Sequence, residues 1–109
     1  MTTTLKVLSQ TNPSAATLTD SYTCGAANGT VVSSLTVCNR SATPTSFRIS
    51  VAPAGAANDV KQYLYFDVPI AGNNTFAATL GVSLANTDVV RVYATLATLS
   101  FNFYGQENS

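Results

Sequence analysis

The clearest pattern in this chain is Thr45-Ser46-Phe47-Arg48-Ile49-Ser50-Val51-Ala52, in which apolar and polar residues take turns. Successive side chains of a β-strand point to opposite faces of a sheet. Phe47, Ile49 and Val51 are therefore expected to face a core, while the polar residues between them face outward. The stretch predicts a half-buried strand over residues 45–52.

The same period of two recurs along the chain, and no window shows the period of an amphipathic helix. Turn-forming residues separate the runs at intervals of roughly 8–12 residues, which is typical of β-sandwiches and barrels. We expect strands near residues 5–10, 16–24, 30–39, 45–52, 60–67, 74–80, 89–96 and 99–104. The prediction is an all-β fold: a single antiparallel β-sandwich, jelly-roll-like, with about eight short strands in one domain over residues 1–109.

Two details of this pattern bear on the cysteines. The run over 30–39 has Val31, Leu35 and Val37 on one side and Cys38 on the other. The Asn28-Gly29 pair before it predicts a turn, because both residues adopt positive φ at low cost. We expect this turn to join 16–24 and 30–39 as a hairpin.

The composition points to assembly. The chain has five acidic residues, five basic residues and no His, so its net charge is zero and charged residues make up only 9%. Binding to nucleic acid needs clustered Lys or Arg, and here they are scattered, so no nucleic-acid partner is predicted. Little self-repulsion opposes association of such a chain. We therefore expect a homo-oligomeric subunit of a larger assembly.

Residues for catalysis are scarce. Without His there is no Ser-His-Asp triad, and two Cys cannot complete a tetrahedral zinc site. Most of the acidic residues fall at strand ends and loops, where Asp is common in turns. Calcium held by Asp59 or Asp88 stays an alternative, although no ligand spacing supports it. We predict no enzymatic activity, no catalytic residue, no cofactor and no metal site.

The location of the protein is predicted from two further patterns. No apolar stretch approaches the roughly 20 residues that span a bilayer, so no membrane partner is expected. The residues after Met1 lack the basic and apolar regions of a signal peptide. The chain is therefore expected to be made in a cytoplasm.

The two cysteines, Cys24 and Cys38, are not expected to bond to each other. In the expected hairpin Cys24 faces a residue near Thr30, which leaves Cys38 some 25 Å away, far beyond the roughly 7 Å between Cα atoms that a disulfide tolerates. Two interpretations stay open: two free thiols, one of them buried, or a disulfide to a neighbouring chain. Cys24 lies beside a Gly-rich turn and is the one expected to be exposed.

Four tyrosines suggest a contact surface. Tyr93 and Tyr104 fall on the outward phase of their strands, as do one or both of Tyr63 and Tyr65. Outward Tyr is favoured at protein interfaces and at sugar-binding faces. Packing of these rings across neighbouring strands is the alternative.

Several strings resemble a family of small virion proteins of tailed bacteriophages, and the resemblance covers nearly the whole chain. The strings are Val37-Cys38-Asn39-Arg40-Ser41, Phe47-Arg48-Ile49-Ser50-Val51-Ala52-Pro53-Ala54-Gly55-Ala56, Tyr63-Leu64-Tyr65-Phe66-Asp67, Asp88-Val89-Val90-Arg91-Val92-Tyr93-Ala94 and Ser100-Phe101-Asn102-Phe103-Tyr104-Gly105. None of them is catalytic. Where this chain has Cys24-Gly25-Ala26-Ala27, the family has an aliphatic residue followed by Pro-Ala-Gly.

The resemblance implies a β-sandwich built into the phage particle, most similar to a collar protein around the neck of a contractile-tailed phage. Such a subunit would join or sheathe neck and tail components, with neck, tail-sheath or capsid proteins and copies of itself as partners. Cys24 and Cys38 are the expected intermolecular crosslinks, and Arg40 and the outward tyrosines the expected subunit contacts. The alternative is a tail-fibre or capsid-decoration module whose loops 53–59 and 71–75 bind host-surface glycans.

Overall fold

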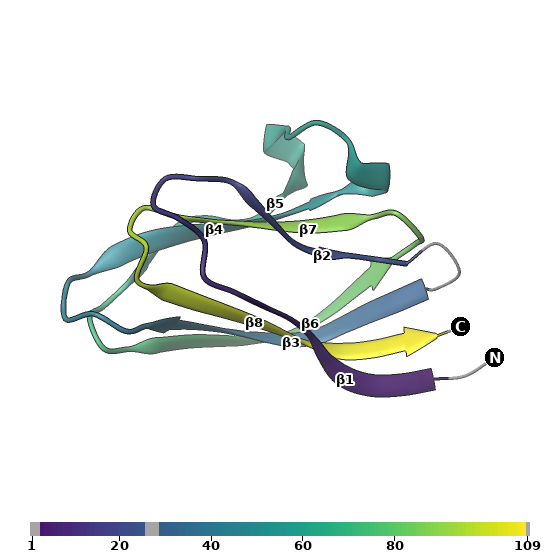
Figure 1. Cartoon of the computed structure of the whole chain (residues 1–109), viewed down its shortest axis with the longest axis horizontal. Helices are drawn as coiled ribbons and strands as arrows, with labels where there is room; N and C mark the ends of the chain where they lie inside the picture. The colour runs from purple at the N-terminus through teal and green to yellow at the C-terminus, as the bar shows by residue number, and fades with distance from the viewer. Residues whose placement is uncertain (1–2, 26–28, 109) are drawn as a thin grey trace.

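The computed structural model describes residues 3–25 and 29–108, which form a sandwich of two four-stranded antiparallel sheets (Figure 1). Sheet A has the strand order β1-β8-β3-β6, and sheet B has the order β2-β7-β4-β5. This is the order of a jelly roll, so the predicted all-β, jelly-roll-like sandwich is confirmed. The strands are β1 (Thr3–Thr11), β2 (Thr19–Thr23), β3 (Gly29–Asn39), β4 (Thr45–Ala52), β5 (Tyr63–Ile70), β6 (Thr75–Leu84), β7 (Val89–Ala94) and β8 (Leu99–Asn108).

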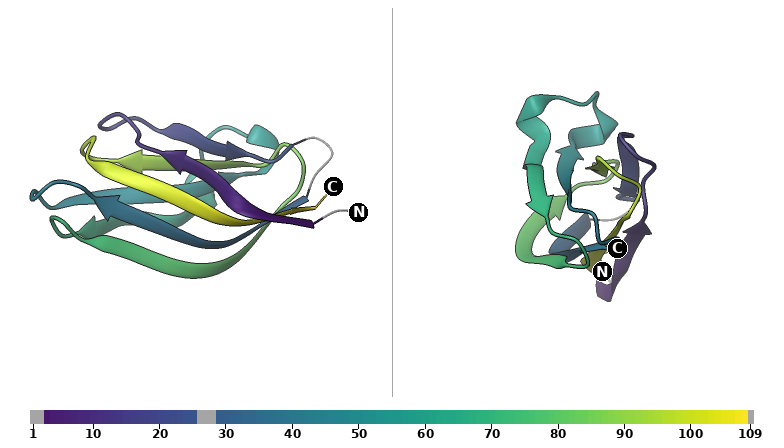
Figure 2. Two further views of the ribbon diagram at one scale, coloured as in Figure 1. Left: turned by 60° about the horizontal axis from the view of Figure 1, so that its bottom comes forward. Right: turned by 90° about the vertical axis from the view of Figure 1, so that its left-hand side faces the viewer.

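The expected hairpin of 16–24 with 30–39 is wrong. β2 pairs with β7 in sheet B, whereas β3 pairs with β6 and β8 in sheet A. The two strands therefore lie in different layers of the sandwich (Figure 2), and each has a buried inner face, with Tyr22 in β2 and Val32 in β3. The predicted Asn28-Gly29 turn falls partly on residues 26–28, which lie outside the described residues.

The core lies between the sheets and is built from the predicted inward residues. Phe47 and Ile49 of β4 are 0% and 1% exposed, and Val51 packs against the same core. The Phe47 ring lies 6.0 Å from that of Phe101 in the opposite sheet and 5.3 Å from that of Phe76. These rings join the two layers, since β4 belongs to sheet B and β6 and β8 to sheet A.

The side-chain alternation of β3 departs from the prediction at one residue. The register of β3 against β8 shifts between Val32 and Ser34, so Ser33 is an extra residue in β3. Such a bulge reverses which side chains face the core. Val32, rather than Val31, therefore joins Leu35 and Val37 inside, and Val32 is only 2% exposed.

The chain between β4 and β5 covers part of the outer face of sheet B (Figure 1). It contains two single 3-10 turns, η1 (Pro53–Gly55) and η2 (Val60–Gln62), so the expected strand over 60–67 begins only at Tyr63. Asp59 caps η2: its carboxylate accepts from the Lys61 N–H at 3.1 Å, and its own N–H donates to Gln62 at 3.3 Å. Within the described residues, no helix has the length and apolar character needed to cross a membrane.

Candidate interaction surfaces

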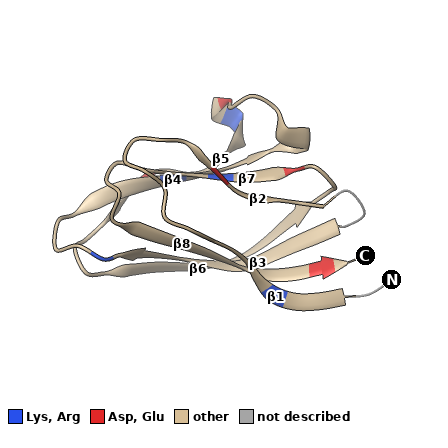
Figure 3. Ribbon diagram, viewed as in Figure 1, with Lys and Arg blue, Asp and Glu red and all other residues tan. Residues whose placement is uncertain are grey.

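The outer face of sheet A carries no charged side chain among the described residues. Its members alternate along the strands with the buried residues of the core: Leu5, Val7 and Gln10 of β1; Ser100, Asn102, Tyr104, Gln106 and Asn108 of β8; Val31, Ser34, Thr36 and Cys38 of β3; and Thr75, Ala77, Thr79 and Ser83 of β6. Figure 3 shows charged residues in β1 and β8, and the other charged residues lie outside the four strands of sheet A. Lys6 and Glu107 belong to sheet A, but Glu107 contacts Tyr22 of sheet B and so points inward. We call this surface the neutral face.

Tyr104 lies in the middle of the neutral face. Its cross-strand neighbours are Val7 of β1 and Ser34 of β3. The Tyr104 hydroxyl shares a hydrogen bond of 3.2 Å with Thr36. Tyr104 is therefore placed outward, as predicted, and it presents an amphipathic ring on a surface of small uncharged side chains.

A shallow open cavity of about 350 Å³ adjoins the neutral face where β1 and β8 lie side by side. Five of its six lining residues have amide or hydroxyl side chains, Gln10, Thr11, Asn12, Ser100 and Asn102, and the sixth is Phe101. The Asn12 amide is held by donation to the carbonyl oxygen of Leu99 at 2.9 Å. Phe101 is 0% exposed, so no aromatic face is open to a ligand in this cavity.

The structure reverses the expected exposure of the two cysteines. Cys24 is 1% exposed, and its Sγ lies 3.2 Å from the Thr30 hydroxyl. The expectation that Cys24 is the exposed thiol is therefore wrong, because Cys24 lies two residues after the buried Tyr22 of β2 and faces the same, inner side. Cys38 is partly buried on the neutral face, between Ser100 and Thr75. The two cysteines form no disulfide with each other, as expected.

The outer face of sheet B is charged and aromatic. The Arg48 guanidinium lies over two rings, 4.2 Å from the centroid of Phe66 and 4.6 Å from that of Tyr93. Asp67 accepts two hydrogen bonds from the same guanidinium, at 2.6 and 3.3 Å. Phe66 remains 54% exposed and Asp67 neutralises the guanidinium, so this group presents an aromatic surface with a paired charge to solvent.

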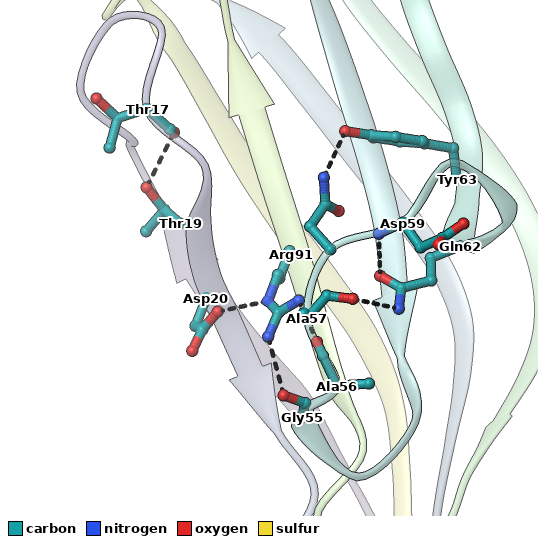
Figure 4. Close-up of polar contacts among 11 residues, drawn as sticks. Thr17, Thr19, Asp20, Gly55, Ala56, Ala57, Asp59, Gln62, Tyr63 and Arg91 are labelled. Atoms are coloured by element: carbon teal, nitrogen blue, oxygen red, sulfur yellow. Dashed lines mark hydrogen bonds and ion pairs between the residues drawn. The ribbon is translucent and has the colours of Figure 1, made fainter.

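Arg91 of β7 holds the η1 loop against sheet B (Figure 4). Its guanidinium donates to the carbonyl oxygens of Ala56 at 2.7 Å and Gly55 at 3.3 Å, and to the Asp20 carboxylate at 3.0 Å. Three segments distant in the sequence are thereby joined. Beneath the loop, Ser50 of β4 is 0% exposed.

The remaining predicted contact residues lie in different parts of the molecule. Tyr63 lies on the outer side of sheet B, 4.9 Å from the Phe66 ring, and Tyr65 packs inward on Phe47 and Phe76. One of these two tyrosines is therefore outward, in line with the prediction. Arg40 is exposed directly after the last residue of β3 and donates to the carbonyl oxygen of Ala97 at 3.2 Å.

Sequence reasoning missed a polar network at the end of the sandwich where the termini lie. Tyr22 is 9% exposed, and its hydroxyl donates to the Glu107 carboxylate and shares a 2.9 Å hydrogen bond with Thr30. Lys6 lies 3.2 Å from the other Glu107 oxygen. Burial and the Glu107 carboxylate raise the pKa of Tyr22 to about 12. The hydrogen bonds from Tyr22 and Lys6 lower the pKa of Glu107.

These shifts predict that the network loses its stabilising effect at both extremes of pH. Because the pKa of Glu107 is lowered in the folded protein, its contribution to stability is complete above the ordinary pKa of a Glu side chain. That contribution is lost as the pH falls through the pKa of Glu107 in the folded protein. The raised pKa of Tyr22 means that its contribution is complete below pH 10 and is lost as the pH rises towards about 12. At neutral pH, Tyr22→Phe is expected to lower the free energy of unfolding by about 1–3 kcal/mol.

The measurement is urea unfolding of the wild type and Tyr22→Phe over a pH series. The difference between the two proteins should be largest at neutral pH and should shrink at both ends. All other titrating groups are the same in the two proteins, so their effects cancel when the two free energies of unfolding are subtracted at each pH. A difference that stays constant across the series would contradict the assigned coupling of Tyr22 and Glu107.

The acidic residues all have structural contacts. Asp20 pairs with Arg91, Asp67 with Arg48, and Glu107 with Lys6. Asp59 caps η2, and Asp88 accepts from the N–H groups of Ala54 and Ala85. Across residues 3–25 and 29–108, no three His, Cys, Asp or Glu side chains lie close enough together to hold a metal ion.

No protein-family model matches the chain, and no curated protein matches it.

Proposed function

We propose that this chain is a non-enzymatic virion protein of a tailed phage, a collar or neck subunit that joins or sheathes neck and tail components. The observation that carries the proposal is the neutral face, which extends over all four strands of sheet A. The cores of protein interfaces are depleted of charged residues and enriched in Tyr. The described part of the neutral face fits that description in two respects: it has no charged side chain, and Tyr104 lies in its middle. The resemblance of the sequence to phage virion proteins supplies the setting.

In this proposal Cys38 is the crosslinking residue. It is the more exposed of the two cysteines and lies on the neutral face, so a contact there brings it against a neighbouring subunit. Cys24 has its sulfur buried, and a bond through it would require this end of the sandwich to open. Thiols stay reduced in a cytoplasm, so two of them would lose two electrons and two protons to dissolved oxygen after the particle is released.

The proposal is tested on purified phage particles that carry the gene, alkylated without reductant and separated on a non-reducing gel. The protein is expected in high-mass species that collapse on reduction, with peptide mapping placing the bond at Cys38. A Cys38→Ser particle should lose these species, whereas a Cys24→Ser particle should keep them. Absence of the protein from particles would overturn the proposed function, and a monomer with both thiols alkylated would overturn the crosslink.

A glycan-binding module is the second candidate, and one observation favours it. Five of the six residues that line the cavity beside the neutral face have uncharged amide or hydroxyl side chains, and such groups suit a neutral polyhydroxylated ligand. Its lining comes from β1, β8 and the residue after β1, whereas loops 53–59 and 71–75 contribute nothing to it. Jelly rolls occur in viral capsid and lectin domains alike, so the fold favours neither candidate. Saturable binding of the free protein to host glycans would favour the second.

A further inference from the structure

The four edges of the two sheets are not equally protected against pairing with another chain. Natural edge strands carry charges, prolines or bulges, or are very short. β1 has Lys6 and a register shift, β2 has five residues including Asp20, and β5 has Asp67 and Pro69. β6 has ten residues, none of them charged and none of them proline. Its register against β3 shifts between Thr79 and Val82, which leaves residues 75–79 regular.

The side of the sandwich next to β6 is also incompletely closed. The inward residues of β6 that precede Leu84 are only partly buried, although they pack against the core. A small apolar cavity of about 10 Å³ lies here, and Leu64 of β5, Leu80 and Val82 are among the residues that line it. Leu64 is 46% exposed. An added strand beside β6 would therefore cover apolar surface as well as satisfy backbone groups.

We propose that β6 pairs antiparallel with β6 of a second copy of this chain, which joins the two neutral faces into one eight-stranded surface. This pairing is one of the contacts that the collar subunit would make, and its place in a phage particle rests on the proposed function. Two-fold symmetric contacts use the same surface on both partners, so that surface must complement itself.

The sequence of β6 meets this condition. Its outward side chains, Thr75, Ala77, Thr79 and Ser83, are small and uncharged, so no like charges face each other across the two-fold axis. The regular part of the strand is centred on Ala77. When Ala77 lies opposite itself, Phe76 lies opposite the partner's Ala78, so a large inward side chain meets a small one. The outward side chains of the two copies then lie on one face of the joined sheet, and the inward side chains lie on the other.

The test uses the full chain and two variants, Ala77→Lys and Ala77→Glu. Ala77 is exposed, so either side chain can point into solvent without disturbing the core. Sedimentation equilibrium of the wild type should show a monomer–dimer equilibrium that is insensitive to reductant. Each variant alone should be monomeric, because two like charges would meet directly at the axis. Mixing the two variants should restore a dimer, which also shows that both are folded.

The matched control is Ala15→Lys, which adds the same charge to an exposed residue in the loop after β1 and should dimerise like the wild type. A wild type that stays monomeric up to millimolar concentration would overturn the pairing, and so would an Ala77→Lys variant that dimerises normally. Failure of the mixed variants to associate would overturn the two-fold register. Presence of the protein in phage particles is measured separately, so loss of this pairing and loss of the proposed function are distinguishable.

Discussion

Replacing Phe47 by alanine is expected to lower the free energy of unfolding by about 3–5 kcal/mol, the usual cost of removing a buried aromatic ring. Phe47 is fully buried, and its ring contacts those of Tyr65, Phe76 and Phe101. These neighbours come from three strands and both sheets. Because the surrounding sheets are held by backbone pairing, they cannot collapse to fill the space. The loss is a large part of the roughly 5–15 kcal/mol that stabilises a typical domain.

Urea unfolding followed by tyrosine fluorescence measures the effect, since the chain has no Trp. Phe47→Leu is the matched control, because leucine fills most of the same space and should cost clearly less. A Phe47→Ala protein within about 1 kcal/mol of the wild type would contradict the assignment of this residue to the centre of the core.

Gly105→Ala is expected to cost about 3 kcal/mol or more, at the upper end of the range for overpacking. A Cβ atom on Gly105 would lie 1.9 Å from the carbonyl oxygen of Val31 and 3.1 Å from the Cα of Val32. Both are backbone atoms of β3, so no rotation of a side chain relieves the clash. The two central strands of sheet A would have to separate at this point, with loss of their hydrogen bonds.

Gly81→Ala provides the matched control, because a Cβ at Gly81 meets no atom within 4 Å. Its free energy of unfolding should stay within about 0.5 kcal/mol of the wild type. Thermal unfolding of the two variants beside the wild type decides the matter. Equal stability of Gly105→Ala and Gly81→Ala would mean that β3 and β8 do not approach each other as closely as described.

The strands themselves could be predicted from the sequence, because alternation follows directly from burying one face of each sheet. Phe47 in β4, Val92 in β7 and Phe101 in β8 all face the core as their patterns indicate. The polar exterior could be predicted in the same way. The order of the strands within the sheets could not, since it depends on contacts between residues far apart in the chain.

The errors about the site have two physical causes. The bulge at Ser33 reverses the alternation of inward and outward side chains in part of β3. A single extra residue cannot be recognised from the sequence where the strand is rich in Ser and Thr. Cys24 was placed at a surface hairpin because Asn28-Gly29 favours a turn, whereas β2 and β3 lie in different layers. Only this crossing brings the Cys24 sulfur beside Thr30 in the interior.

The polar network at Tyr22 was missed for a related reason. Gln106, Glu107 and Asn108 have no apolar alternation, so they resemble a tail rather than a strand. β8 nevertheless continues through them, because β1 and β3 pair with it on both sides up to Asn108. Backbone pairing to two neighbours thus maintains a strand that its own side chains do not predict.

The pairing of Thr3 with Asn108 places the first and last described strands next to each other, with their ends at the same end of the sandwich (Figure 1). A mechanical load applied between residues 3 and 108 would pull β1 away from β8 like a zipper, one pair of hydrogen bonds at a time. Strands loaded in this way separate at low force, because the bonds break in sequence rather than together. A load that enters through the sheet faces or edges does not act on this pair of ends, so it does not start this separation.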